Sequence, residues 1–462
     1  MKKISRTLII ILMAVLLLSL ASCQKCDGKH TGDFEKITVY SNVIQPTCTE
    51  GGSRTEMICC ALCYEKLETN IISTDPLGHD MSEGKCTRCG AYDPGMGLYM
   101  KLNGTGNGYV VTAIGNFTDT YLEIPDTYNG KTVVGIADGA FKDCTFLQTV
   151  VISDNIVFIG DGAFEGCTAL ERVVMGNAVS EVGEGVFEGC TALEYNKTLK
   201  NKFDIAYLGN EKNPHLVLVK CLGYSGGLDL PEAEIQSGTR VIASGAFEGI
   251  SRLYKIDVPD SVAYICDSAF ADCVNLTYVD IGKSVVYIGD SAFEGCVELS
   301  SVKMTDSVVS LGENAFRNCI DLIDIKLSSS ITAIKAGTFY NCRDLTSVKI
   351  PAKVSSIGGC AFENCLKLTT VEIGNGVTAI GYRAFYGCKE LLQFDAPSAL
   401  KEIGISAFEC CQSLKTVNLN DGLLSIGERA FSHCESLGKV KVPETVSYIG
   451  ENCFDYSPSD TE

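Results

Sequence analysis

Phenylalanine recurs at intervals of 23 residues along most of this 462-residue chain. It stands at positions 141, 164 and 187, and then at 247, 270, 293, 316, 339, 362, 385, 408, 431 and 454. One interval, from Phe187 to Phe247, is 60 residues long. An insertion inside one coil of a stacked repeat would shift its neighbours out of register, so a period held to the residue indicates a solenoid. The sequence therefore predicts a mainly β solenoid that stacks 23-residue coils.

Each coil contains a short segment whose residues alternate between apolar and polar. In residues 300–304, Val302 and Met304 alternate with Ser301 and Lys303. This period of two is typical of a β-strand with one face buried. We expect it to pair in parallel with its equivalents in the adjacent coils, and we expect the repeated phenylalanines to stack in the core.

Eleven coils carry a cysteine three residues after the phenylalanine. These are residues 144, 167, 190, 273, 296, 319, 342, 365, 388, 411 and 434. Stacked strands lie about 4.8 Å apart. Side chains that stack in register point the same way, which keeps their Cβ atoms too far apart for a disulfide. We therefore expect small buried thiols.

The first 22 residues have the features of an export signal. Lysine and arginine at the start are followed by a long apolar run and then by small residues. The stretch Leu20-Ala21-Ser22-Cys23 resembles a bacterial lipobox, in which the cysteine is lipidated and becomes the mature N-terminus. We predict a lipoprotein signal peptide over residues 1–22, lipidation of Cys23, and an extracytoplasmic, membrane-anchored protein at the cell surface. An uncleaved membrane anchor is the alternative.

Residues 23–95 are rich in cysteine and are expected to form a small ribbon-like module. Cys60 and Cys63 form one C-x2-C pair, and Cys86 and Cys89 form a second pair, with 22 residues between the two pairs. Two such pairs can converge on one tetrahedral structural zinc. Export to an oxidising compartment permits the alternative, a set of disulfides in a domain with little core. Both interpretations stay open.

Residues 96–142 contain short β-like runs separated by turns, and we expect a β cap and the first coil, because a bare solenoid end exposes core and strand edge. Repeats then fill residues 143–462, with an insertion near residues 195–235. Within it, residues 203–209 and 215–223 indicate a hairpin that leaves the stack. Inserted loops on solenoids often bind partners. The alternative is a local extension of the sheet that binds nothing.

The repeat I-G-x-x-A-F-x-x-C-x-x-L-x-x-V-x-I, which recurs from about residue 110 to residue 454, resembles the BspA-like class of bacterial leucine-rich repeats. The resemblance implies a leucine-rich-repeat stack, and it implies cell-surface adhesion or protein binding rather than enzymatic activity. A surface or extracellular protein is the partner it favours.

The composition argues against several other classes of function. The net charge of −19 argues against binding to nucleic acid, or to an anionic membrane by charge alone. Four scattered histidines provide no nucleophile–base arrangement. The alternative function is a glycan-binding or cell-envelope structural protein, although sugar platforms favour tryptophan and the chain has none.

One outward strand position suggests a binding face. Ten residues after each phenylalanine from Phe247 onward, successive coils carry Asp257, Asp280, Lys303, Lys326, Lys349, Glu372 and Asp395. Stacking would place three lysines side by side between acidic residues. We predict that Lys303, Lys326 and Lys349 bind an acidic segment of a partner, and that Asp280 and Glu372 reject misaligned segments. In the alternative, Asp324 and other nearby acids neutralise the lysines.

Overall fold

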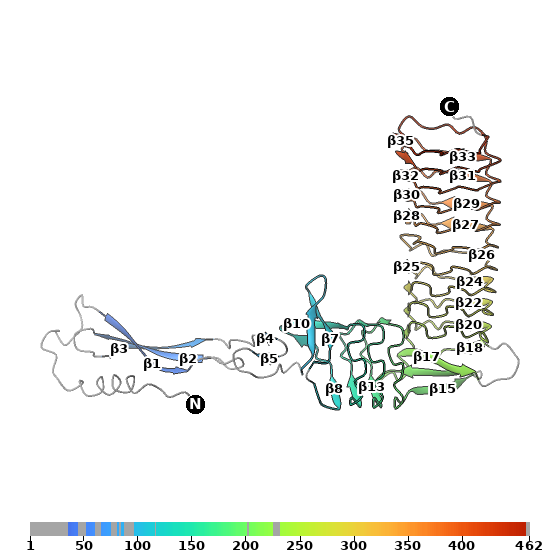
Figure 1. The fold of residues 1–462 in the computed structure, drawn as a ribbon. Coiled ribbons are helices and arrows are strands. Elements are labelled where there is room, and N and C mark those ends of the chain that lie inside the picture. The colour runs from blue at the N-terminus through green and yellow to red at the C-terminus, as the bar shows by residue number, and fades with distance from the viewer. Residues whose placement is uncertain are drawn as a thin grey trace, which may run out of the picture. The chain divides into compact units, whose positions relative to one another are not determined.

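The computed structural model describes residues 36–44, 52–60, 66–74, 81–82, 85–86, 97–115, 117–200, 203–224 and 232–458. The chain forms two compact units, Met1–Gly97 and Leu98–Glu462. Strands and turns account for the regular structure of the described ranges, which contain no helix (Figure 1). Accordingly, no helix long and apolar enough to cross a membrane is found among them.

The first unit contains a three-stranded antiparallel sheet in the order β1-β2-β3 and a small antiparallel pair, β4-β5. The bounds are Lys36–Ile44 for β1, Gly52–Cys60 for β2, Lys66–Thr74 for β3, Met81–Ser82 for β4 and Lys85–Cys86 for β5.

The second unit begins with a β cap. β6 and β7 form an antiparallel hairpin, and β7 pairs in parallel with β10, the first short strand of the stack. The bounds are Tyr99–Leu102 for β6, Gly108–Ala113 for β7, Tyr121–Glu123 for β8, Thr127–Tyr128 for β9 and Lys131–Ile136 for β10. Pairing with β6 and β7 covers the edge that the first coil would otherwise expose.

Each coil then contributes up to two short strands, and each set of strands pairs in parallel with those of the adjacent coils. One N-terminal sheet has the order β14-β12-β10-β7-β6 and the other has the order β13-β11-β8. The bounds are Thr149–Val151 for β11, Phe158–Ile159 for β12, Arg172–Val174 for β13 and Glu181–Val182 for β14. The solenoid that the sequence predicts is confirmed.

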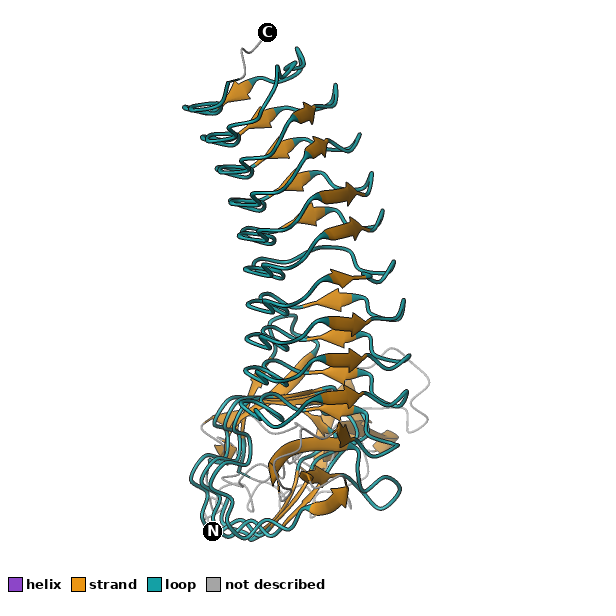
Figure 2. Cartoon of the chain, turned by 90° about the vertical axis from the view of Figure 1, so that its right-hand side faces the viewer, coloured by secondary structure: helices purple, strands orange, loops and turns teal. Residues whose placement is uncertain are grey.

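The later coils form a longer stack whose strands lie one above another (Figure 2). One sheet has the order β18-β20-β22-β24-β26-β27-β29, and β31 pairs with β33. The bounds are Glu232–Glu234 for β18, Lys255–Asp257 for β20, Tyr278–Asp280 for β22, Ser301–Lys303 for β24, Asp324–Ile325 for β26, Ser347–Ile350 for β27, Thr370–Ile373 for β29, Gln393–Asp395 for β31 and Thr416–Asn418 for β33.

The two-residue strands make the other side of these coils. Their bounds are Val241–Ile242 for β19, Tyr264–Ile265 for β21, Tyr287–Ile288 for β23, Ser310–Leu311 for β25, Ser356–Ile357 for β28, Ala379–Ile380 for β30, Glu402–Ile403 for β32, Ser425–Ile426 for β34 and Tyr448–Ile449 for β35.

The repeated phenylalanines form a continuous stack in the core. Between Phe247 and Phe454, adjacent ring centroids lie 5.1 to 5.6 Å apart and the rings are nearly parallel. Most of these side chains are fully buried. Because the strands of a sheet repeat about every 4.8 Å, the backbone sets this spacing. Truncating one such ring to alanine costs about 3–5 kcal/mol.

The repeat cysteines are buried thiols, and each from Cys167 onward makes the same hydrogen bond. Its Sγ–H donates to the carbonyl oxygen of the phenylalanine in the preceding coil, at 3.0 to 3.2 Å. In the last coil Ser457 occupies the cysteine position, and its Oγ–H donates to the Phe431 carbonyl at 2.8 Å. The position therefore requires a small side chain with a donor.

The insertion differs from the prediction that it leaves the stack. It forms the antiparallel strands β15 (Asn196–Lys200), β16 (Phe203–Leu208) and β17 (Val217–Tyr224), and β17 pairs in parallel with β19. Phe203, Ile205 and Tyr207 are almost completely buried and belong to the core of the later coils. Burial of these apolar residues keeps the hairpin in the sheet, where it covers the first of those coils.

The thiols predict a pH dependence of stability. Burial raises the pKa of Cys273 and of Cys434 to about 12, whereas an unfolded thiol titrates near about 8.5. Each such thiol therefore stabilises the folded state fully below about pH 8.5, and this contribution is lost as the pH rises toward the folded pKa, at about 1.4 kcal/mol per pH unit. With a reductant present, the melting temperature should be flat from about pH 7 to 8 and should fall steeply from about 8.5 to 9.5.

A variant with Cys273, Cys296 and Cys319 replaced by serine, which retains the donor, should lose less stability over that range. A melting temperature that stays constant to about pH 9.5 in the natural chain would contradict this account.

Candidate functional site

The predicted binding column lies on the outward face of the sheet that contains β20, β22, β24, β26, β27 and β29. Parallel pairing aligns Asp257 with Asp280, and Asp280 with Lys303. At the other end of the column, it aligns Lys349 with Glu372. The inward neighbours in these strands, such as Val279 and Val302, are buried. The alternation seen in the sequence therefore assigns these charged residues to the outer surface.

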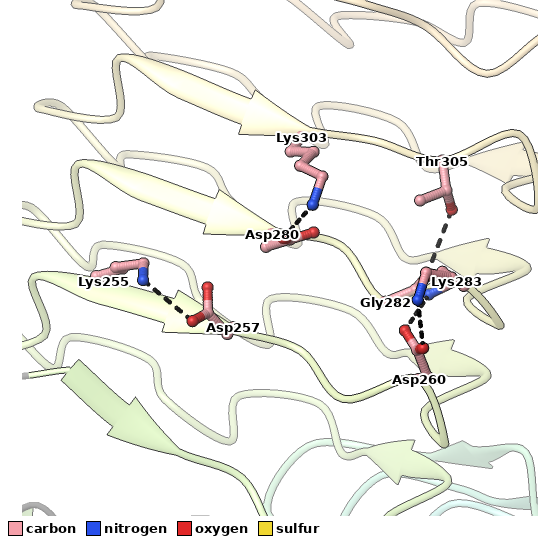
Figure 3. A network of polar contacts seen from close by, with 8 residues as sticks. All are labelled: Lys255, Asp257, Asp260, Asp280, Gly282, Lys283, Lys303 and Thr305. Atoms are coloured by element: carbon pink, nitrogen blue, oxygen red, sulfur yellow. Dashed lines mark hydrogen bonds and ion pairs between the residues drawn. The ribbon is translucent and has the colours of Figure 1, made fainter.

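The two outer lysines form ion pairs with acids of the same column. Lys303 Nζ lies 2.5 Å from Asp280 Oδ2 (Figure 3), and Lys349 Nζ lies 2.7 Å from Glu372 Oε2. The hydrogen bond to Asp280 raises the pKa of Lys303, and the hydrogen bond to Glu372 raises the pKa of Lys349. Both lysine side chains are more than half exposed. Pairing outward, away from the centre of the column, reduces the repulsion between stacked lysines.

Lys326 occupies the centre of the column. Its coil is aligned with both neighbours, because Val302 pairs with Ile325 and Ile325 pairs with Val348. The side chain is exposed and has no ion pair or hydrogen bond with any residue of the described chain. Between two ion pairs, the column therefore presents one ammonium that forms no ion pair within the described chain, although Lys326 is near enough to Asp306 to help lower the pKa of that carboxyl. The acids that pair with its neighbours are Asp280 and Glu372 rather than Asp324.

The turn after each strand has its own polar column, which is structural. Asp260 accepts hydrogen bonds from the backbone N–H of Lys283 and from its ammonium group (Figure 3). Two coils on, the backbone N–H of Ser329 donates to Asp306 at 2.8 Å, which lowers the pKa of that carboxyl. These aspartates hold the turn of the next coil through hydrogen bonds to its backbone. Their role is structural, so the outward strand column remains the candidate site.

An apolar residue beside the column was missed by the sequence analysis. Ile323, directly before β26, exposes 51% of its surface. Equivalent coils carry Thr277, Ser300, Thr346 and Thr369 at this position, and their hydroxyls bond to carbonyls of the preceding coil. Tyr254 and Leu392 occupy the same position three coils before and three coils after Ile323 and are also exposed, so the available signal was the replacement of a hydroxyl residue by a large apolar or aromatic one. Ile323 places an apolar contact in the same coil as Lys326.

The other predicted site residues are not tested by the structure. Cys60 and Cys86 end β2 and β5, where the backbone alone is described. Cys23, Cys63 and Cys89 lie outside the described residues.

The two histidines of the repeat domain make ring contacts with tyrosines. His215 packs edge-on against Tyr207 at 5.1 Å, and His433 stacks on Tyr456 at 4.6 Å.

A comparison with protein families agrees with the repeat fold. The family model described as the BspA type leucine rich repeat region matches residues 113–210, 224–346 and 332–460, in six copies. A search of curated proteins found no match to the chain.

Several solved structures are similar. A leucine-rich repeat protein from Bacteroides ovatus shares 23% identity over 79% of this chain and 98% of its own, with a TM-score of 0.40. A leucine rich cell surface protein from Faecalibacterium prausnitzii shares 26% identity over 77% and 93%, with a TM-score of 0.35. A leucine-rich repeat protein from Eubacterium ventriosum shares 20% identity over 78% and 92%, with a TM-score of 0.40.

Proposed function

Because the chain belongs to the family of BspA-type leucine-rich repeat proteins, we propose that it is a cell-surface binding protein whose strand face recognises a protein partner. Members of this family are in general non-enzymatic binding scaffolds. The repeats supply a rigid surface, since each coil is hydrogen-bonded to the next and the core between them is continuous.

The arrangement around Lys326 is the observation that supports the proposal. Exposed Lys326, which forms no ion pair with the described residues, lies between two ion pairs of the same column, with exposed Ile323 in the same coil. An acidic side chain of a partner can pair with Lys326 while an apolar neighbour covers Ile323. Asp280 and Glu372 disfavour a partner carboxylate placed one coil away, which fixes the alignment.

The partner segment is therefore short, acidic and partly apolar. Exposed ion pairs contribute at most about 1 kcal/mol each. Most of the affinity must then come from apolar contacts beside the column, and the charges set alignment and association rate. Binding should weaken as salt is raised, because the charges are exposed and the Debye length is about 8 Å at physiological ionic strength.

The strand face can be tested by replacing Lys303, Lys326 and Lys349 together with serine. Partners are first captured from host and bacterial extracts with the full chain, and a glycan array is run beside the capture. We expect at least a tenfold loss of affinity for the captured protein and a smaller salt dependence, because the change removes the ammonium of Lys326, which is available to pair with an acid of the partner.

The matched control replaces Lys283, Lys367 and Lys389 with serine, which removes the same charge from positions outside the column. Equal affinities for the two triple variants, at unchanged melting temperature, would exclude the column as the binding site. Binding to the glycan array with no protein captured would favour the alternative glycan-binding function.

Attachment to the membrane is the second part of the proposal. The export signal and the lipobox-like stretch ending at Cys23 support an extracytoplasmic lipoprotein that is anchored through its N-terminal lipid. Cys23→Ala should yield a chain without lipid that moves from the detergent phase to the aqueous phase. The mass of the N-terminal peptide checks this directly, and an unchanged mass and partitioning would refute lipidation.

A structural zinc in the N-terminal module is the third part of the proposal. The two C-x2-C pairs, Cys60 with Cys63 and Cys86 with Cys89, have the spacing that supports one tetrahedral site. Metal analysis of the full chain should give about one zinc per molecule, and this zinc should be lost in a variant with Cys86 and Cys89 replaced by serine. Disulfides at the four positions with no bound metal would establish the alternative.

A further inference from the structure

Adjacent coils are joined at the phenylalanine turn by three backbone hydrogen bonds. Between the second and third coils, Gly162 N–H donates to Glu184 O at 2.9 Å, Phe164 N–H to Val186 O at 2.9 Å, and Gly166 N–H to Glu188 O at 2.7 Å. The same bonds recur between the later coils, for example from Phe270 to Ala292 and from Phe385 to Ala407. The donors lie two residues before the phenylalanine, at it, and two residues after it.

The coil of Phe187 has these three donors but no next coil to receive them. Gly185, Phe187 and Gly189 donate their N–H groups to no acceptor in the part of the chain that the structure describes. The Phe187 ring is stacked on Phe164 at 5.6 Å, and no other described ring stacks on its opposite face. The chain continues into the insertion, and the next repeated phenylalanine comes 60 residues later.

The coil of Phe247 touches the coil of Phe187 at one corner. Ser244 N–H donates to Val182 O at 2.9 Å, and Arg240 Nη1 donates to Asn177 O at 2.7 Å. On the phenylalanine side, β17 lies along the coil of Phe247 instead, with Cys221 N–H bonded to Ala246 O at 2.7 Å. β17 therefore covers the first coil of the later stack. At the end of the earlier stack, the N–H groups of Gly185, Phe187 and Gly189 have no acceptor in the described chain.

A cavity of about 280 Å³ lies between the coil of Phe187 and the strand β17, and we call it the junction slot. It is lined by the turn of residues 183–189, by Tyr195, by Val219, Lys220 and Leu222 of β17, and by residues 243–245 and Glu248. Its volume is near the lower end of the roughly 300–1,000 Å³ typical of ligand pockets. The slot can hold one large side chain and its backbone, and it combines an apolar wall with three aligned donors.

The charges of the residues that line the junction slot determine which hydrogen-bond acceptor can bind in it. Glu184, Glu188 and Glu248 line the slot, against the single ammonium of Lys220. Burial, with Glu184 nearby, raises the pKa of Glu248, which agrees with a slot that already holds excess negative charge. An anionic ligand is therefore disfavoured, although three N–H groups in a row are a common anion site. Neutral peptide carbonyls flanked by basic side chains satisfy the donors without adding negative charge.

We propose that the junction slot binds a basic peptide segment of a partner protein, which adds to the sheet edge as the missing coil would. Carbonyls of alternate residues in the segment accept hydrogen bonds from Gly185, Phe187 and Gly189, and one large side chain between them enters the slot, while the Phe187 ring itself stays buried. Elsewhere in the stack these donors meet carbonyls of alternate residues in the repeat turn of the next coil, such as Glu184, Val186 and Glu188, so the segment binds in that turn conformation. This site is separate from the strand face and goes beyond the function proposed above.

Peptides taken from the repeats of this chain can serve as probes of the junction slot. A labelled peptide of residues 335–345, with Cys342 changed to serine, carries Lys335, Phe339 and Arg343 in the repeat turn. A peptide of residues 289–299, with Cys296 changed to serine, has the same turn with three acidic residues. We expect the first peptide to bind the full chain at least tenfold more tightly than the second. Phe339→Ala in the peptide should also weaken binding at least tenfold.

The matched protein variants are Leu222→Trp, which fills the slot, and Leu424→Trp, which adds the same side chain at a position that is similarly exposed, 47% against 44%. Leu222→Trp should abolish peptide binding and Leu424→Trp should leave it unchanged, both at the natural melting temperature. Equal binding of the two peptides, no binding of either, or binding that survives Leu222→Trp would overturn the proposal.

Amide hydrogen exchange provides a direct measurement of the donors. In the free chain the amides of Gly185, Phe187 and Gly189 should exchange quickly, while those of Gly162, Phe164 and Gly166 should be protected, and the basic peptide should protect the first set. Protection of both sets in the free chain would mean that the chain fills its own slot, which also overturns the proposal. The triple lysine variant of the strand face should bind the peptide normally, so failure at one site is distinguished from failure at the other.

Discussion

The hydrogen bonds between equivalent residues of adjacent coils are the constraint on which the rest of this structure depends. Each coil is bonded to the next at its two strands and at its phenylalanine turn. These bonds hold equivalent positions in register, so that phenylalanine meets phenylalanine and each thiol meets the carbonyl of the preceding coil. Parallel backbone pairing also explains why the 23-residue period tolerates no insertion within a coil.

The same constraint determines what must happen where the stack is interrupted. The first coil is covered by the β6–β7 hairpin, and the coil of Phe247 is covered by β17. On the side of the Phe187 coil that faces away from Phe164, no strand of the described chain accepts hydrogen bonds from Gly185, Phe187 and Gly189. A buried backbone donor without an acceptor is unfavourable in general, so an open row of three donors beside an apolar wall is the place where a partner backbone contributes most.

Register also converts sequence positions into surface columns, and neighbours within a column determine its chemistry. Charges one coil apart are close enough to pair, as Asp280 and Lys303 do. The column contains three lysines, but two of them form ion pairs, and only Lys326 of the three forms none within the described chain. Its recognition properties depend on this pairing, and on the exposed Ile323 beside it, more than on the number of lysines.

The sequence by itself determined the solenoid, the phenylalanine stack, the buried thiols and the outward position of the lysine column, because a strict period fixes which residues are equivalent and alternation fixes which side they face. The tertiary structure alone decided three points. Lys303 and Lys349 pair with Asp280 and Glu372, the acids aligned with them in the adjacent coil. The hairpin stays in the sheet because Phe203 and Tyr207 are buried. The donors of Gly185, Phe187 and Gly189 remain open because β17 covers the coil of Phe247 instead, a choice between two stack ends that no local pattern encodes.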